Sequence, residues 1–146
     1  MNLHDAITKE TVEYGRDLAW SQGKSVKVEQ ASLIFDKQKL FSQLMGDTQL
    51  VKKILRIFLE EAPGLMTALD KSVKNNNSEA TRALVHKIAG TAGSISAFAL
   101  WDAAKQMERA AEKGEAPSLR LCRDEVLLQF DLLKRVLEWW GILESS

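Results

Sequence analysis

Cysteine, proline and histidine are all scarce in this sequence: among 146 residues there are one cysteine, two prolines and two histidines. With Cys122 as its single thiol, the chain cannot form an internal disulfide, and one cysteine cannot build a zinc site of the usual kind. Cys122 falls on an apolar helical stripe, which predicts a buried structural thiol rather than a reactive one. This cysteine usage is compatible with a cytoplasmic location.

Long apolar runs and an excess of charge are also absent. No stretch approaches the roughly 20 apolar residues that a helix needs to cross a bilayer, and the N-terminus lacks the apolar core of a secretory signal. Twenty basic and twenty acidic side chains give a formal net charge of zero, whereas a general nucleic-acid binder relies on positive charge to displace counterions from phosphates. We therefore expect no nucleic-acid partner and no membrane contact by this segment.

The chain divides into a leader, residues 1–30, and a domain, residues 31–146. The leader has a weak apolar stripe and then a turn-like stretch, Ser21-Gln-Gly-Lys-Ser25. It could be an extra helix docked on the domain, an interdomain linker or in part an expression remnant. The remainder is long enough for one domain with its own core, and the chain is 45% hydrophobic.

In the domain, apolar residues recur every three or four positions, and no segment alternates with a period of two. Four long apolar seams with short connections predict an all-α fold, an antiparallel up-down four-helix bundle with an additional short helix covering one end. The short helix is expected over 37–45 and the long ones over 49–74, 79–95, 99–112 and 117–140.

Several residues mark the expected helix ends. Asp47 or Thr48 can cap the helix over 49–74, and Ser78 the helix over 79–95. Gly114 fits the left-handed position after the helix over 99–112. Pro63 lies inside a helix and predicts a kink near Glu60 to Ala62, because proline lacks a backbone donor and clashes with the preceding turn.

One helix, over 79–95, has two unlike faces. Its predicted apolar stripe consists of Ala80, Leu84, Ile88 and Ile95, and at ~100° per residue His86 projects nearly opposite that stripe. Its neighbours on that side are Ala89, Gly90 and Gly93. Each helical glycine costs about 1 kcal/mol relative to alanine, and close approach of another macromolecule would explain such residues. On spacing alone, a surface histidine without a role is the commoner interpretation.

The run His86-Lys-Ile-Ala-Gly90, followed by Thr-Ala-Gly-Ser-Ile, resembles the signature of histidine-containing phosphotransfer (HPt) domains. In that signature, His-x-Leu-Lys-Gly precedes small residues and then Leu-Gly. The flanks are similar too, with Phe58-Leu-Glu-Glu-Ala-Pro63 before the histidine and the Met107-Glu108 helix after it. The resemblance extends over residues 33–141. Two positions depart from the pattern: Ala89 stands where the family usually has lysine, and Ser96 where it usually has glycine.

The resemblance implies a phosphorelay intermediate of two-component signalling, of the kind found in bacterial hybrid sensor kinases. His86 would accept a phosphoryl group from a receiver-domain aspartate and pass it to another receiver. The chain would have no kinase activity of its own, and it contains no ATP-binding loop motif. It would need no cofactor and no metal, because the partner receiver holds the Mg²⁺. The expected partners are response-regulator receiver domains and a hybrid sensor histidine kinase, and we expect a cytoplasmic monomer, free-standing or part of a membrane-anchored kinase.

Other residues have supporting roles by the same resemblance. Glu108 could accept a proton from one imidazole nitrogen and leave the other free, or it could be a solvated surface residue. Arg82 and Lys87 could offer positive charge to the phosphoryl group or to the acidic rim of a receiver. The docking face would include Ala89, Gly90 and Gly93.

Two other functions stay open at this point. Ala89, in place of the usual lysine, favours a helical module that binds receivers without transferring phosphate. A helical bundle that uses His86 to hold a cofactor or metal is the third possibility.

Overall fold

The computed structural model describes residues 34–139, which form five helices and contain no strand. The expected leader over residues 1–30 and the end of the last helix at Trp140 lie outside these residues. The helices are α3 (Lys37–Gln43), α4 (Thr48–Lys74), α5 (Ser78–Ser94), α6 (Phe98–Lys113) and α7 (Ala116–Trp139).

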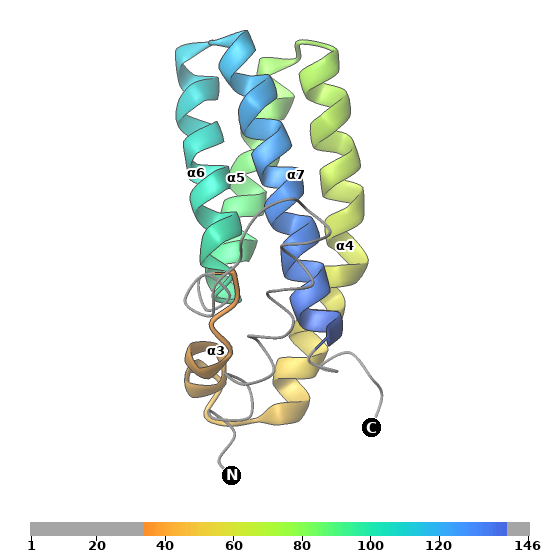
Figure 1. The fold of residues 1–146 in the computed structure, drawn as a ribbon, viewed down its shortest axis with the longest axis vertical. Coiled ribbons are helices and arrows are strands. Elements are labelled where there is room, and N and C mark those ends of the chain that lie inside the picture. Colours follow the sequence, from red (N-terminus) through yellow and green to blue (C-terminus); the bar gives the residue numbers. More distant parts are fainter. Residues whose placement is uncertain (1–33, 140–146) are drawn as a thin grey trace.

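The four long helices run alternately up and down and form an antiparallel bundle, with the short α3 at one end (Figure 1). The predicted fold class is therefore confirmed. Helix α3 is joined to the bundle by buried Leu40 and by a backbone hydrogen bond from Asp36 to the carbonyl of Ser96, in the corner between α5 and α6. In the described part of the chain, no helix combines the length and the apolar character needed to cross a membrane.

Local sequence determines where these helices begin and end. Asp47 caps α4, as predicted, by accepting a hydrogen bond from the amide of Leu50. The prediction for α5 was wrong: Asn77 caps it through the amide of Ala80, and Ser78 is already the first helical residue. Gly114 takes the predicted left-handed conformation, with φ 68°.

Helix α4 continues without interruption through Pro63, whose side chain is exposed. An exposed proline ring displaces no core side chain, and the helix has eight buried residues to fix it in the bundle. The kink expected near Glu60 to Ala62 stays a prediction.

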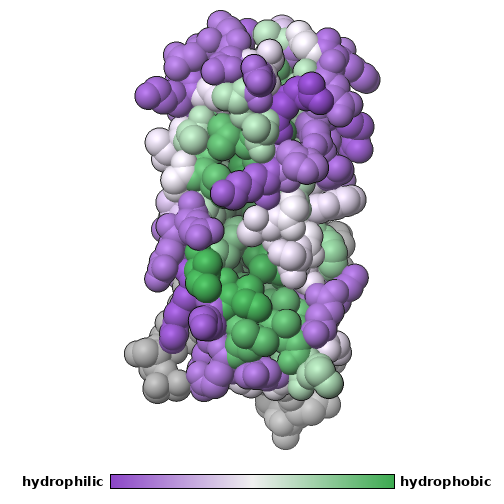
Figure 2. All heavy atoms as spheres, turned by 180° about the vertical axis from the view of Figure 1, so that it is seen from behind, coloured by the Kyte–Doolittle hydropathy of each residue, from purple (hydrophilic) through white to green (hydrophobic). Residues whose placement is uncertain are grey.

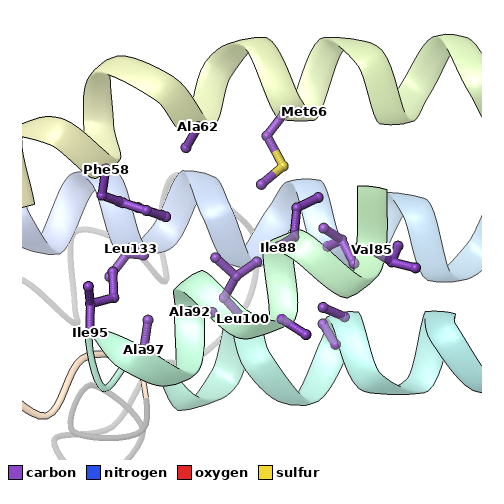
Figure 3. Packing of buried hydrophobic residues seen from close by; sticks show 14 of the residues in the cluster. Phe58, Ala62, Met66, Val85, Ile88, Ala92, Ile95, Ala97, Leu100 and Leu133 are labelled. Carbon is purple, nitrogen blue, oxygen red and sulfur yellow. The ribbon is translucent and has the colours of Figure 1, made fainter. Parts of the chain in front are cut away.

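The interior is filled mainly by aliphatic side chains from all four long helices. Figure 3 shows residues of α4 directed into the space where residues of α5 and α7 also lie; among those labelled are Phe58, Met66, Val85, Ile88 and Leu133. Phe58 also meets Phe130 of α7 edge to face, with ring centroids 6.0 Å apart. Such packing fixes the relative positions of α4, α5 and α7.

The apolar stripe predicted for α5 was correct at Ile88 and Ile95, which are buried, and misplaced by about one residue at its other two positions. Ala80 and Leu84 are only half-buried, whereas the fully buried positions are Thr81, Val85, Ile88, Ala89 and Ala92. The helix is therefore turned further toward α6 than the prediction had it. Alanines at 89 and 92 allow α6 to pack closely on that side, and they carry little hydrophobic signal in the sequence.

The single thiol also differs from expectation. Cys122 is half-buried on α7 rather than fully buried. Burial, and then the negative charge of Glu125, raise the pKa of this thiol. A raised pKa lowers the fraction of reactive thiolate, so the interpretation of Cys122 as structural stands.

Candidate functional site: an exposed imidazole held by a carboxylate

His86 projects from the outer side of α5, and 79% of its side chain is exposed. The ring is anchored on one side only, where its Nδ1 lies 2.8 Å from Oε2 of Glu108 on α6. The other nitrogen, Nε2, is separated from Nδ1 by Cε1, so its lone pair points in a different direction from the contact with Glu108. The neighbouring helix therefore orients the imidazole without covering it.

Glu108 is held more firmly than the histidine. Its side chain is only 16% exposed, and its second oxygen, Oε1, accepts a hydrogen bond of 2.7 Å from Nζ of Lys105, one turn earlier on α6. The hydrogen bond from Lys105, followed by the one with His86, lowers the pKa of Glu108 below its usual 4.5, against an opposing effect of burial.

The ionised carboxylate determines which nitrogen of a neutral His86 carries the proton. A carboxylate can only accept hydrogen bonds, so the contact with Oε2 requires Nδ1 to be the donor. Nε2 then has a free lone pair and points away from its anchor. This is the arrangement that a nucleophilic imidazole needs.

An open hollow surrounds the imidazole at the junction of α5 and α6. Arg82, which lies one turn before His86 on α5, lines this hollow together with the histidine. Lys87 is exposed and lies outside the hollow. The residues that line the hollow are Ser78, Glu79, Arg82, Ala83, His86, Glu108 and Ala111.

The three small residues expected beside His86 have three different environments. Gly90 is exposed, and nothing lies within 4 Å of where a Cβ would be. A Cβ on Gly93 would lie 3.2 Å from Cδ1 of Trp101, so this glycine gives room to an indole of α6. Ala89 is only 3% exposed. The expectation that Ala89 belongs to a docking face was therefore wrong, because the turn of α5 toward α6 places it in the core.

Sequence reasoning missed Lys105, Glu79 and Trp101. Lys105 had a detectable signal, since residues three apart on a helix are neighbours and Lys105 precedes Glu108 by three. Glu79 had a weaker one, because it lies seven residues, or nearly two turns, before His86. The contact between Trp101 and Gly93 joins two helices, and no local pattern marks it.

An exposed apolar stripe runs along the first half of α4. Its residues are Leu50, Ile54 and Ile57; Leu50 and Ile57 are exposed and Ile54 is half-buried. Asp70, which pairs with Arg123 of α7, marks the side of α4 that faces α7. At ~100° per residue the stripe lies on the opposite side, toward α5. Figure 2 shows the face of the bundle opposite to that of Figure 1. Hydrophobic residues gather there over the lower part of the bundle, where the first half of α4 lies.

Residues 34–139 contain no group of three or more His, Cys, Asp and Glu side chains that could hold a metal ion. The site of this part of the chain thus consists of the imidazole, its carboxylate, the lysine behind that carboxylate and the charges of the hollow.

Residues 34–139 thus form a four-helix bundle with an exposed histidine, His86, that is oriented by a carboxylate of the next helix. The model of the Hpt domain family matches residues 53–139, which is more than half of the chain, and the chain belongs to this family. Members of the family are histidine phosphotransfer modules that interact with receiver domains. No curated protein and no solved structure matches the chain.

Proposed function

We propose that this chain is a phosphorelay intermediate that accepts a phosphoryl group on Nε2 of His86 from a receiver-domain aspartate and passes it to another receiver. The observation that carries the proposal is the contact between Nδ1 of His86 and the Glu108 carboxylate. It leaves Nε2 as the free nucleophile on a ring whose side chain is 79% exposed. An exposed nucleophile suits a donor that is another protein's side chain.

In the proposed transfer, the Nε2 lone pair attacks the phosphorus of the aspartyl phosphate. The N–P bond forms as the P–O bond to the aspartate breaks, and the aspartate leaves as a carboxylate. Nδ1 keeps its proton, so positive charge develops on the ring while the bond forms. The Glu108 carboxylate lies 2.8 Å from Nδ1 and stabilises that charge. Transfer to the next receiver follows the same steps in reverse: the receiver's aspartate attacks the phosphorus, and the N–P bond breaks.

The charges around the ring fit this chemistry. Phosphoryl transfer depends mainly on in-line positioning and on neutralisation of the phosphoryl oxygens. Arg82 lines the same hollow as His86 and can offer its guanidinium to those oxygens. We propose that Lys87, which lies outside the hollow, instead faces the acidic rim of the docked receiver. The Mg²⁺ that the reaction needs is held by the receiver, and this chain needs no cofactor or metal of its own.

The docking surface in this proposal extends from His86 across Gly90 to the apolar stripe of α4 (Leu50, Ile54 and Ile57). Gly90 offers bare backbone one turn from the histidine, and the stripe offers apolar area that no described helix covers. An interface with a hydrophobic centre and a charged rim is typical of specific protein pairs. The natural partners are then receiver domains of a hybrid sensor kinase and of its response regulator, in the cytoplasm, with this chain as a monomer.

A transfer assay tests the proposal directly. The chain is incubated with a receiver labelled on its aspartate with radioactive phosphate, and the label is followed on both proteins. We expect label on this chain that is stable to base and labile to acid, as a phosphohistidine is. His86→Gln should abolish it. Label that persists in the His86→Gln variant would mean that another residue is the acceptor.

A second function has one observation in its favour. The position three residues after His86, where the family usually has lysine, is occupied by buried Ala89. A chain that lacks this cation could bind a receiver without accepting its phosphate. A phosphotransfer protein that accepts label from the same receiver serves as the positive control. If the wild-type chain binds the receiver but acquires no label on His86 during many turnovers of that control, the non-transferring module is favoured.

A further inference from the structure

The contact between Lys105 and Glu108 has no part in the transfer step as proposed above. Nζ of Lys105 lies 2.7 Å from Oε1 of Glu108, while Oε2 of the same carboxylate lies 2.8 Å from Nδ1 of His86. The carboxylate thus bridges a lysine and the histidine, with one oxygen for each. Among the described residues, Lys105 and His86 are the two side chains within hydrogen-bond distance of the Glu108 carboxylate.

A glutamate with one oxygen unheld would orient the imidazole poorly. The terminal torsion of a glutamate side chain is broad, so a single hydrogen bond to an exposed ring does not fix the carboxylate plane. The second hydrogen bond fixes it from the other side. Lys105 is suited to this, because only 35% of its side chain is exposed and it comes from the same helix as Glu108, one turn away.

The other charged groups near the ring do not substitute for Lys105. Arg82 and Glu79 line the hollow with His86, but neither is paired with Glu108. Lys87 is exposed outside the hollow. Lys105 is the cation that contacts the carboxylate directly.

We propose that Lys105 is a positioning residue for the phosphoacceptor: by holding Oε1 of Glu108, it keeps Oε2 on Nδ1 of His86 and so keeps Nε2 as the free nucleophile. The expected effect of Lys105 on transfer rests on the proposed function. The inference goes beyond that function because it assigns a role to a residue that contacts neither the phosphoryl group nor the histidine. It also makes a claim about the ring itself, which holds whether or not transfer occurs.

A double-mutant cycle separates positioning from direct contact. We expect Lys105→Met to lower the maximal rate of transfer from a phosphorylated receiver about tenfold, with little change in the receiver concentration for half-maximal rate. Lys105→Arg should restore most of the rate. In a Glu108→Ala background, Lys105→Met should have no further effect, because its action passes through Glu108. Lys113→Met, on the last turn of the same helix, is the matched control and should leave the rate unchanged.

The tautomer of His86 gives a readout that does not depend on transfer. In ¹⁵N-labelled protein above neutral pH, the two ring-nitrogen shifts report which nitrogen carries the proton. We expect the wild-type chain to hold the proton on Nδ1 and Lys105→Met to show a mixture of the two tautomers. Lys113→Met should match the wild type. Circular dichroism and thermal melting of each variant establish that it is folded.

The outcomes distinguish this inference from the proposed function. If wild type accepts label on His86 and Lys105→Met transfers equally fast with an unchanged tautomer, the positioning role is wrong and the proposed function stands. Additive effects of Lys105→Met and Glu108→Ala would also overturn it, since Lys105 would then act on the phosphoryl group or the receiver. If wild type accepts no label, the proposed function fails, and the tautomer measurement still decides the role of Lys105.

Discussion

Gly90 lies one helical turn beyond His86 on the exposed side of α5, and nothing occupies the 4 Å around the position that its side chain would take. The fold therefore gives no packing reason for a glycine here. Gly90→Ala should raise the free energy of unfolding by about 1 kcal/mol, since alanine is the better helix former. If a receiver approaches this backbone, the same methyl group should slow transfer. Urea unfolding and the labelled-receiver assay measure the two effects.

The control for this prediction is Gly64→Ala. Gly64 is also an exposed glycine inside a helix with nothing within 4 Å of its Cβ position, but it belongs to α4. It should give the same gain in stability without slowing transfer. Equal slowing by both substitutions would show that stiffening of the bundle, rather than a methyl group beside the histidine, is responsible.

The apolar stripe of α4 makes a second prediction. Ile57 is 44% exposed, so Ile57→Ser should cost little stability, less than about 1 kcal/mol for the half-exposed side chain. If the stripe is part of the receiver interface, the dissociation constant for a receiver should rise about tenfold, as for a central apolar contact. Titration calorimetry with an unphosphorylated receiver measures it.

Leu121 offers the comparison for Ile57. It is an exposed leucine on α7, 73% exposed, and α7 lies on the side of α4 away from the stripe. Leu121→Ser should leave receiver binding as in the wild type. Weakening by Leu121→Ser, with none by Ile57→Ser, would place the interface on α7.

The fold was predictable from the sequence wherever large apolar residues carry the pattern. On α4, Val51, Leu55 and Phe58 repeat at helical spacing, and all three are buried. On α5 the buried positions include Thr81 and two alanines, whose hydrophobicity is too weak to mark a face. The stripe was therefore placed about one residue away at two of its positions, and the burial of Ala89 followed only from the packing of α6.

The candidate site was predictable in part. His86 and Glu108 were singled out by their resemblance to a family pattern, and the structure places Nδ1 of His86 2.8 Å from Oε2 of Glu108. Lys105 and Trp101 act through contacts whose importance depends on how α6 lies against α5, and a local pattern does not specify that. Arg82 was expected near the histidine from its spacing; both residues line one hollow, and its role toward a phosphoryl group stays a prediction.

The charge state of Glu108 predicts how acid affects stability. Its pKa in the folded chain is lowered below the ordinary 4.5 by the hydrogen bonds with Lys105 and His86. The stabilisation that these contacts give is therefore present above pH 4.5 and is lost as the pH falls through the lowered value. Glu108→Gln lacks the charge, so the difference in unfolding free energy between wild type and variant should shrink in acid. Urea unfolding from about pH 7 down to about pH 3 tests this, and a difference that widens in acid would contradict it.

Ser96 predicts a gain in stability from a single substitution. Its backbone has a left-handed φ of 62°, it is fully buried in the corner between α5 and α6, and its hydroxyl has no hydrogen-bond partner among residues 34–139. A left-handed residue with a Cβ costs roughly 1–2 kcal/mol, and an unpaired buried hydroxyl adds to that cost. Glycine relieves both, although it loses more freedom on folding. Ser96→Gly should therefore raise the free energy of unfolding by about 1 kcal/mol and the melting temperature by roughly 3–5 °C.

Ser94→Gly, at an exposed helical position of the same segment, is the control and should be destabilising by roughly 0.5–1 kcal/mol. Equal destabilisation by both would mean that the corner tolerates serine without strain.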